Sequence, residues 1–265
     1  LDLYTQEKEI ALWSYLRKRN KLSDSLPVKA LPILRMLGGS LEKELSDAKV
    51  LRGAGFRHWK IKVGLLPLSE DLERVGQLSE ILTDDVVSVD ANGAMSLENA
   101  ILFCQSPKTS RLSFAEQLIS PDRSPEDFLE LKSHSRVPIG LDESIHGVKE
   151  ICRWIDLGAF DGASLKLIKT GGLLPALECA NLLGTRGLGI NLACKVAETS
   201  LAGAATASLG FAIPKVSWGF SMSNQYLEFD IAEHALTATH GHLEVSKLNP
   251  VGVGIVPNLD RVNHA

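Results

Sequence analysis

The sequence predicts an α/β fold in which most of the chain forms a (β/α) barrel. Short apolar runs alternate with helix-length segments, which is the pattern of a parallel sheet. The chain has 265 residues, the usual size of one eight-fold barrel, and 45% of them are hydrophobic. Charged residues close five of the apolar runs at intervals of about 28, 26, 26 and 24 residues, roughly one strand, one helix and two loops. They are Lys62, Asp90, Glu116, Asp142 and Lys166.

The elements follow in order along the chain. Apolar residues at helical intervals, followed by a basic cluster, predict a helix at Glu7–Arg19. Eight short runs bounded by Gly, Pro, Asp or Ser are the predicted strands: Val28–Leu34, Trp59–Val63, Val86–Val89, Leu112–Ala115, Val137–Leu141, Ala163–Leu165, Leu188–Leu192 and Lys215–Trp218. The predicted helices that follow strands are Leu68–Leu82, Ser96–Cys104, Pro125–Lys132, Val148–Ile155, Leu173–Leu183 and Glu198–Leu209. From about Ala235 the chain is turn-rich, and we expect it to pack outside the barrel.

Composition narrows the class of partner. The net charge of −4 arises from 28 basic and 32 acidic residues without a basic stripe, so we expect a small-molecule partner and no nucleic acid. The four cysteines are far apart in sequence and are predicted to be reduced thiols, which favours a cytoplasmic protein. The longest stretch of low charge, SLAGAATASLGFAIP, is short and rich in Ala, Ser and Gly, so no membrane span is expected.

Two lysines in the run WKIKVG have a physical rationale as a base. Lys60 and Lys62 are two residues apart, so both side chains point to the same face of a strand. Like-charge repulsion and desolvation lower a lysine pKa, which can yield a neutral amine able to take a proton. Lys62, nearer the strand end, is the candidate base, and Lys60 is expected to tune it. Taken alone, the pair is more typical of a solvated edge strand.

Three acids are candidate metal ligands. Asp90, Glu116 and Asp142 each follow an apolar run directly, and the carboxyl ends of neighbouring parallel strands lie together. A site with only oxygen ligands suits Mg²⁺, which acts as a Lewis acid on a substrate carboxylate. Any one of these acids alone is more typical of a cap at the start of the next helix. Three at matching spacing favour the metal site.

Five motifs occur in order along nearly the whole predicted barrel: K-x-K, D-x-N (Asp90, Asn92), E-Q (Glu116, Gln117), D-E-S (Asp142–Ser144) and K-x-x-x-x-G-G (Lys166, Gly171, Gly172). Together they resemble the motifs of the enolase superfamily, muconate lactonising enzyme subgroup. The resemblance implies a TIM-type barrel in which the three acids bind Mg²⁺. It also implies that Lys62 is the acid/base lysine of the second strand and that Lys166 is its counterpart on the opposite face.

Within that subgroup the chain is most similar to the o-succinylbenzoate synthases. These enzymes dehydrate 2-succinyl-6-hydroxy-2,4-cyclohexadiene-1-carboxylate to 2-succinylbenzoate in menaquinone or phylloquinone synthesis. The resemblance then implies that Lys62 removes the α-proton to give an enediolate and returns it to the departing hydroxyl. Lys166 would stabilise the anion from the other face. Asn92 is either a ligand to a lysine or carboxylate or a turn residue.

The resemblance also implies a division of the chain. Enzymes of this superfamily begin with an α+β capping domain, most of which is absent from this sequence. We expect residues 1–24 to be the last helix of that domain, residues 25–232 to be the catalytic barrel, and residues 233–265 to return toward the cap. After the seventh predicted strand, Lys195 stands where small polar residues are usual, and it either pairs with a succinyl carboxylate or points outward.

Other functions remain open at this stage. An N-acylamino acid racemase or a dipeptide epimerase would use the same two lysines as opposed bases. The acidic D-x-D pair that binds a dipeptide ammonium is missing from the eighth strand region, KVSWGFSMSNQ. No histidine ends the seventh strand, which disfavours a mandelate-racemase type of site. From another class, a ligand-binding barrel without catalysis is the alternative, and it requires that Lys62 and Lys166 do not face one another across the acids.

Overall fold

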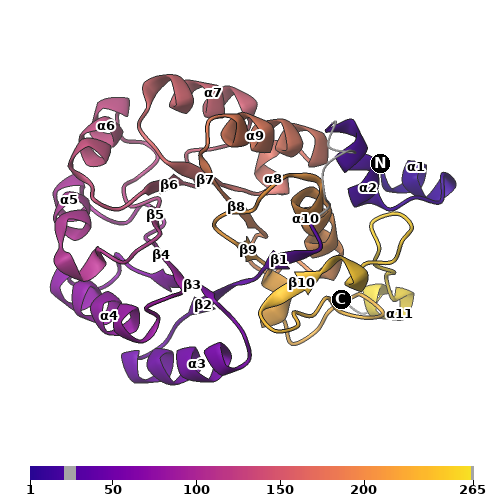
Figure 1. The fold of residues 1–265 in the computed structure, drawn as a ribbon, viewed down its shortest axis with the longest axis horizontal. Coiled ribbons are helices and arrows are strands. Elements are labelled where there is room, and N and C mark those ends of the chain that lie inside the picture. The colour runs from indigo at the N-terminus through magenta and orange to yellow at the C-terminus, as the bar shows by residue number, and fades with distance from the viewer. Residues whose placement is uncertain (21–27, 264–265) are drawn as a thin grey trace.

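Eight parallel strands form a ring at the centre of the molecule (Figure 1). The computed structural model describes residues 1–20 and 28–263. Sheet neighbours follow chain order from β2 to β9, and a parallel bridge between Ile33 and Phe220 brings the two edges of the sheet together. The strands of the ring are β2 Leu34–Leu37, β3 His58–Lys62, β4 Val86–Asp90, β5 Phe114–Glu116, β6 Ile139–Leu141, β7 Gly162–Leu165, β8 Gly189–Ala193 and β9 Phe220–Ser221.

Helices surround this ring, one after nearly every strand (Figure 1). They are α3 Leu41–Gly53, α4 Leu68–Ile81, α5 Leu97–Gln105, α6 Pro125–His134, α7 Val148–Leu157, α8 Leu167–Thr170, α9 Leu173–Thr185 and α10 Ser200–Ala212. Three of them have a serine as N-cap, Ser40, Ser96 or Ser124, whose side chain accepts a hydrogen bond from a backbone N–H of the first turn. The predicted barrel is therefore confirmed, and α3 is an added helix that the sequence did not predict.

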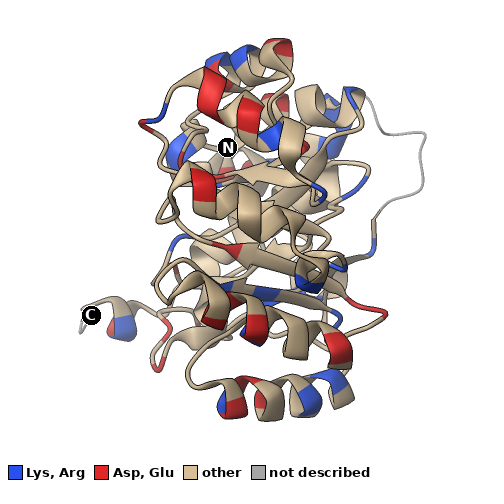
Figure 2. Ribbon diagram, turned by 90° about the vertical axis from the view of Figure 1, so that its left-hand side faces the viewer, with Lys and Arg blue, Asp and Glu red and all other residues tan. Residues whose placement is uncertain are grey.

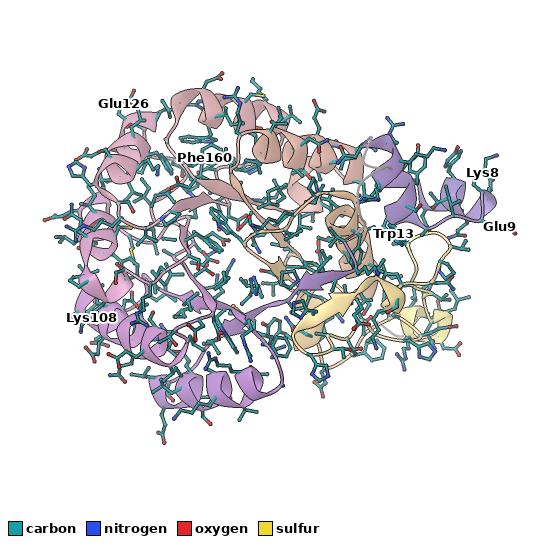
Figure 3. The ribbon with its side chains drawn as sticks, in the orientation of Figure 1. Lys8, Glu9, Trp13, Lys108, Glu126 and Phe160 are labelled. Atoms are coloured by element: carbon teal, nitrogen blue, oxygen red, sulfur yellow. The ribbon has the colours of Figure 1, made fainter. Side chains whose placement is uncertain are left out.

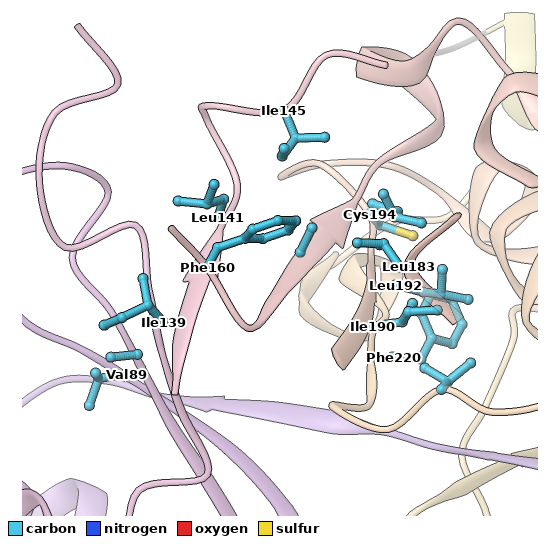
Figure 4. Packing of buried hydrophobic residues seen from close by; sticks show 14 of the residues in the cluster. Val89, Ile139, Leu141, Ile145, Phe160, Leu183, Ile190, Leu192, Cys194 and Phe220 are labelled. Carbon is cyan, nitrogen blue, oxygen red and sulfur yellow. The ribbon is translucent and has the colours of Figure 1, made fainter. Parts of the chain in front are cut away.

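Apolar side chains fill the space between the ring and the helices (Figure 3). Val89, Ile139 and Leu141 belong to this buried cluster (Figure 4). Both signs of charge occur on the outer helices (Figure 2). None of the helices in the described part of the chain combines the length and the apolar character needed to cross a bilayer.

The prediction that Val28–Leu34 is the first barrel strand is wrong. Within Val28–Leu34, residues Ala30–Pro32 form β1, which pairs antiparallel with β10 (His242–Glu244) outside the ring. The barrel strand β2 begins only at Leu34. Ile33 is the point where the chain passes from one sheet to the other: its backbone N–H donates to the carbonyl oxygen of Gly241, and it forms a parallel bridge with Phe220 of the ring. An apolar run that continues from one sheet into another gives no signal of the break.

The eighth predicted strand is also displaced. Lys215–Trp218 lies before β9, and Trp218 stands in a turn that ends at Gly219, whose φ is 91°. The indole lies across the beginning of the neighbouring strands and stacks on Phe114, with ring centroids 4.1 Å apart. Trp218 is therefore not part of a strand. Its side chain lies at the end of the barrel where the strands begin, which we call the barrel floor.

The N-terminal region is two helices and not the single helix predicted at Glu7–Arg19. α1 spans Asp2–Glu7 and α2 spans Leu12–Arg19. Between them the backbone of Ile10 and Leu12 hydrogen-bonds Gly252, so the chain leaves the helical path to pair with the C-terminal segment. This segment also contains η3 (Val245–Lys247) and α11 (Leu259–Asn263) and lies beside α1 and α2 (Figure 1). The predicted boundary at residues 24 and 25 lies outside the described residues.

Stability is expected to fall as the pH drops from about 6.5 to about 4, through His58 at the start of β3. Burial, together with His242, lowers the pKa of His58 to about 4 against the opposing effect of Asp85. Between these pH values the unfolded chain binds a proton that native His58 does not, which removes on the order of 2 kcal/mol of stability. Urea unfolding of the wild type and His58→Gln across this range measures the effect, and equal pH slopes in the two proteins would refute it.

Candidate active site

The five charged residues of the sequence pattern lie at the carboxyl end of the ring. Lys62 is the register partner of Asp90 across β3 and β4, and Asp90 is the partner of Glu116 across β4 and β5. Asp142 directly follows β6, and Lys166 directly follows β7. The structure therefore brings side chains from five consecutive strands to one edge of the sheet.

Both lysines of β3 pair with these carboxylates. Lys60 is buried, and its Nζ donates to Glu116 Oε2 at 2.5 Å and lies 3.8 Å from Asp90 Oδ2. Lys62 Nζ donates to Asp90 Oδ2 and to Asn92 Oδ1, both at 2.6 Å, and its side chain is 36% exposed. Lys60 is thus enclosed among the acids, whereas Lys62 also reaches solvent.

Asp142 pairs with two lysines that follow the neighbouring strand β7. Lys166 and Lys169 each donate to the Asp142 carboxylate, and Lys169 also donates to the Asp142 carbonyl oxygen. Sequence reasoning missed Lys169. The available signal was the short spacing, because Lys166 is the N-cap of the short helix α8 and Lys169 lies within that helix.

Lys62 and Lys166 lie on opposite sides of one pocket. β3 and β7 are four positions apart in a ring of eight strands, so they are diametrically opposed. Both lysines line an open pocket of about 350 Å³ whose wall also contains Lys60, Asp90 and Glu116. The geometry required of two opposed lysines, each beside a carboxylate, is present.

Burial and charge shift the pKa values of this cluster in opposite directions. Burial raises the pKa of Glu116 to about 7 despite Lys60, and the nearby charges of Asp90 and Asp142 add to this rise. Burial acts in the same direction on Asp142, yet Lys169 and Lys166 together hold the pKa of that carboxyl below its usual value.

The like-charge argument for the two β3 lysines leaves out the carboxylates that lie around Lys60. Burial disfavours its charged form, but Glu116 and Asp90 outweigh this and raise the pKa of Lys60. The pKa of Lys166 is also raised, because Asp142 outweighs the cost of burial. The K-x-K argument considered only the repulsion between two lysines, whereas each lysine faces a carboxylate from a neighbouring strand.

The donor set suits Mg²⁺. Asp90, Glu116 and Asp142 are 3%, 1% and 1% exposed, and they offer only oxygen ligands. Their mutual repulsion contributes to the raised pKa of Glu116, and a divalent cation would relieve it. In the described residues no group of His, Cys, Asp and Glu side chains is arranged to hold a metal ion as it stands, because the carboxylates approach lysines rather than one another.

Two residues in left-handed backbone conformations join the loops around the acids. Asn92 has φ 45° and donates from its backbone to Asp90 Oδ1 and from its side chain to Glu143. Gln117 has φ 38°, and its Oε1 accepts from the backbone N–H groups of Asp142 and Ser144. The two roles considered for Asn92, partner of a lysine and turn residue, are both present.

The other side of the pocket is mostly apolar. The residues that line it there are Leu34, Met36, Ala193, Cys194, Lys195, Val196, Ala197, Ser221, Met222, Ser223, Tyr226 and Leu227. Lys195 is exposed at this rim, and its backbone N–H bonds Glu198. Among the described residues that line the pocket, the acidic ones are Asp90 and Glu116. In the part of the chain that the structure describes, the wall therefore offers a substrate apolar contact and cationic groups, but no further carboxylate.

Comparison with known proteins gives consistent matches. The profile of the enolase C-terminal domain-like family matches residues 43–261. The chain is 29% identical to an L-Ala-D/L-amino acid epimerase of Flavobacterium johnsoniae over 96% of this chain and 70% of that protein. It is 26% identical to a hydrophobic dipeptide epimerase of Citrifermentans bemidjiense over 83% of this chain, and it spans only 60% of that protein's length. A solved muconate lactonizing enzyme of Pseudomonas fluorescens superposes with a TM-score of 0.89 at 25% identity, covering 99% of this chain and 69% of that one.

Proposed function

The chain belongs to the enolase superfamily, in the muconate lactonising enzyme subgroup, and from this premise we propose that it is a racemase or epimerase. The reaction is inversion of a carbon alpha to a carboxylate, in which one lysine removes the α-proton and the other lysine delivers a proton to the opposite face. The observation that carries the proposal is the placement of Lys62 and Lys166 on opposite walls of one pocket. The names of the relatives, among them dipeptide epimerases and an N-succinyl-L-Arg/Lys racemase of Bacillus cereus, support it.

The two lysines have complementary roles in this mechanism. One takes the α-proton as a free amine, and the other delivers a proton to the opposite face as an ammonium, so the product has inverted configuration. Their protonation states are exchanged for the reverse direction. Asp90, Glu116 and Asp142 would hold Mg²⁺, which when bound offsets the negative charge that develops on the substrate carboxylate.

The lining of the pocket favours an N-acylated amino acid over a dipeptide with a free amino terminus. A substrate ammonium needs a carboxylate partner, and the acids that line the described pocket are the two proposed metal ligands. Apolar residues such as Met36, Met222 and Tyr226 suit an apolar side chain or acyl group.

Dehydration to 2-succinylbenzoate is the second candidate, and one observation favours it. A dicarboxylate fits a pocket whose described lining contains Lys60, Lys62, Lys166 and Lys195 but no acid beyond the proposed metal ligands. In that reaction Lys62 alone removes the α-proton and returns it to the leaving hydroxyl, while Lys166 stabilises the anion. The two candidates share the first proton transfer and differ in the work of the second lysine.

A substrate panel in D₂O with Mg²⁺ tests the proposal. We expect deuterium at the α-carbon of N-succinylleucine and loss of its optical purity. L-Ala-L-Leu should react at least about tenfold more slowly, because the described pocket lining offers its ammonium no acid beyond the proposed metal ligands. Excess EDTA is the control and should abolish exchange. Dehydration of the cyclohexadiene substrate without racemisation of N-succinylleucine would contradict the proposal and assign the synthase reaction.

A further inference from the structure

An ion pair between the helices α3 and α4 contacts the backbone of Lys62 at the end of β3. Arg74 of α4 donates from Nε to Glu44 Oε2 of α3 at 2.5 Å, and its Nη2 donates to the other oxygen of the same carboxylate. Glu44 is fully buried, and the Arg74 side chain is 12% exposed. Such a two-point contact fixes the plane and the direction of the guanidinium group.

The remaining nitrogen of this guanidinium group reaches the backbone of the candidate base. Arg74 Nη1 donates to the carbonyl oxygen of Lys62 at 2.7 Å. The ladder between β2 and β3 ends one residue earlier, at the pair of Leu37 and Ile61. Arg74 therefore supplies a donor to β3 at the point where its neighbour β2 stops.

Asp71, also in α4, binds the backbone turn that follows β3. Asp71 Oδ2 accepts from the N–H of Gly64, two residues after Lys62, at 2.6 Å. Gly64 has φ 89°, so the chain turns sharply there. The end of β3 is thus fixed from α4 on both sides of the turn, and Glu44 holds Arg74 in place.

We propose that Arg74 is a positioning residue for Lys62, acting through the Lys62 carbonyl, and that it governs proton transfer on one face of the substrate only. The inference rests on the proposed two-lysine function. Lys166 has separate supports, because it pairs with Asp142 and is the N-cap of α8 on the opposite side of the ring. A displacement of about 1 Å at a reacting group can slow a reaction about 100-fold, whereas the distant lysine keeps its geometry.

The test measures deuterium exchange separately for N-succinyl-D-leucine and N-succinyl-L-leucine in D₂O with Mg²⁺. Lys62→Arg first identifies the enantiomer whose exchange requires Lys62. We expect Arg74→Met to slow exchange of that enantiomer about 10- to 100-fold and to leave the other within about twofold. Because a lone Glu44 would be a buried unpaired charge, Glu44→Gln/Arg74→Met is the second variant, in which the same selective loss is expected.

Arg52→Met is the matched control. It removes an arginine whose Nε lies 3.1 Å from the buried carboxylate of Asp85, but it does not touch Lys62. In Arg52→Met the ratio of the two exchange rates should be the same as in the wild type. Equal slowing of both enantiomers by Arg74→Met, or no slowing, would overturn the inference.

A second readout separates this inference from the proposed function. No exchange of either enantiomer by the wild type would refute the proposed function, and the NMR signal of Lys62 labelled by reductive ¹³C-methylation then decides the positioning role. Arg74→Met should shift this signal and leave that of Lys166 in place, because the Lys62 contacts to Asp90 and Asn92 depend on the strand end. An unshifted Lys62 signal overturns the inference whatever the substrate.

Discussion

Lys62→Arg is expected to abolish α-proton exchange from one enantiomer of N-succinylleucine while the other continues to exchange. Arginine keeps the positive charge beside Asp90 but cannot lose its proton near neutral pH, so it cannot act as the base. The loss should be about 10³-fold, the size of a general-base contribution. Lys166→Arg should give the mirror result, with the opposite enantiomer silent. Proton NMR of each enantiomer in D₂O measures both rates directly.

The reason for this asymmetry is that each lysine serves one face. A substrate proton on the Lys166 side can still leave, and deuterium can return from the same lysine, so exchange without inversion persists in Lys62→Arg. Racemisation itself stops in both variants. Lys132→Arg is the control. Lys132 Nζ lies 2.7 Å from Asp161 Oδ1, and this ion pair is remote from the pocket.

The contrary result has a definite meaning. If Lys62→Arg silences both enantiomers and Lys166→Arg silences neither, a single lysine performs all proton transfers. The two-base proposal would then be wrong, and the dehydration reaction with Lys166 as an electrostatic group would take its place. Both variants keep a cation at the position, so loss of the ion pairs with Asp90 and Asp142 does not explain either pattern.

The pattern of charged strand ends was predictable because it depends on chain order alone. In a parallel ring, successive strands lie side by side, so Lys62, Asp90, Glu116, Asp142 and Lys166 must gather once the eight strands close. Sequence spacing contains that information directly.

The displaced strands and the missing lysine depend on contacts between distant segments. β1 leaves the barrel because β10, more than 200 residues later, pairs with it, and no local pattern marks the exchange at Ile33. Lys169 belongs to the site because Asp142 lies beside α8. The raised pKa of Lys60 follows from Glu116 on a strand two positions away. These features require the packed structure.

Trp218 shows the same dependence on long-range packing, and it carries the largest expected effect on stability. Gly140, Gly162 and Gly189 are register partners across β6, β7 and β8 and form a row without side chains at the barrel floor. A Cβ added at Gly189 would lie 2.2 Å from the indole, and one at Gly162 would lie 2.3 Å from it. The glycine row is therefore the slot that admits the ring, which Phe114 covers on one face.

Trp218→Leu is expected to lower the free energy of unfolding by about 3 kcal/mol, because it leaves the slot partly empty. Gly189→Ala should cost about as much in the presence of Trp218, since the three nearest atoms to the new methyl group all belong to the indole. Combined with Trp218→Leu, Gly189→Ala should cost less than about 1 kcal/mol, because the methyl group then enters free space. Urea unfolding of the four proteins measures this coupling.

Gly184→Ala is the matched control for the glycine substitution. Gly184 lies in α9 with nothing within 4 Å of an added Cβ, so alanine should stabilise the helix by up to about 1 kcal/mol. Additive costs for Gly189→Ala and Trp218→Leu would show that the clash is not what excludes a side chain at Gly189. A strong coupling would instead assign the glycine row to the indole, and it would explain why Trp218 lies in a turn at the floor rather than in the strand that the sequence predicts.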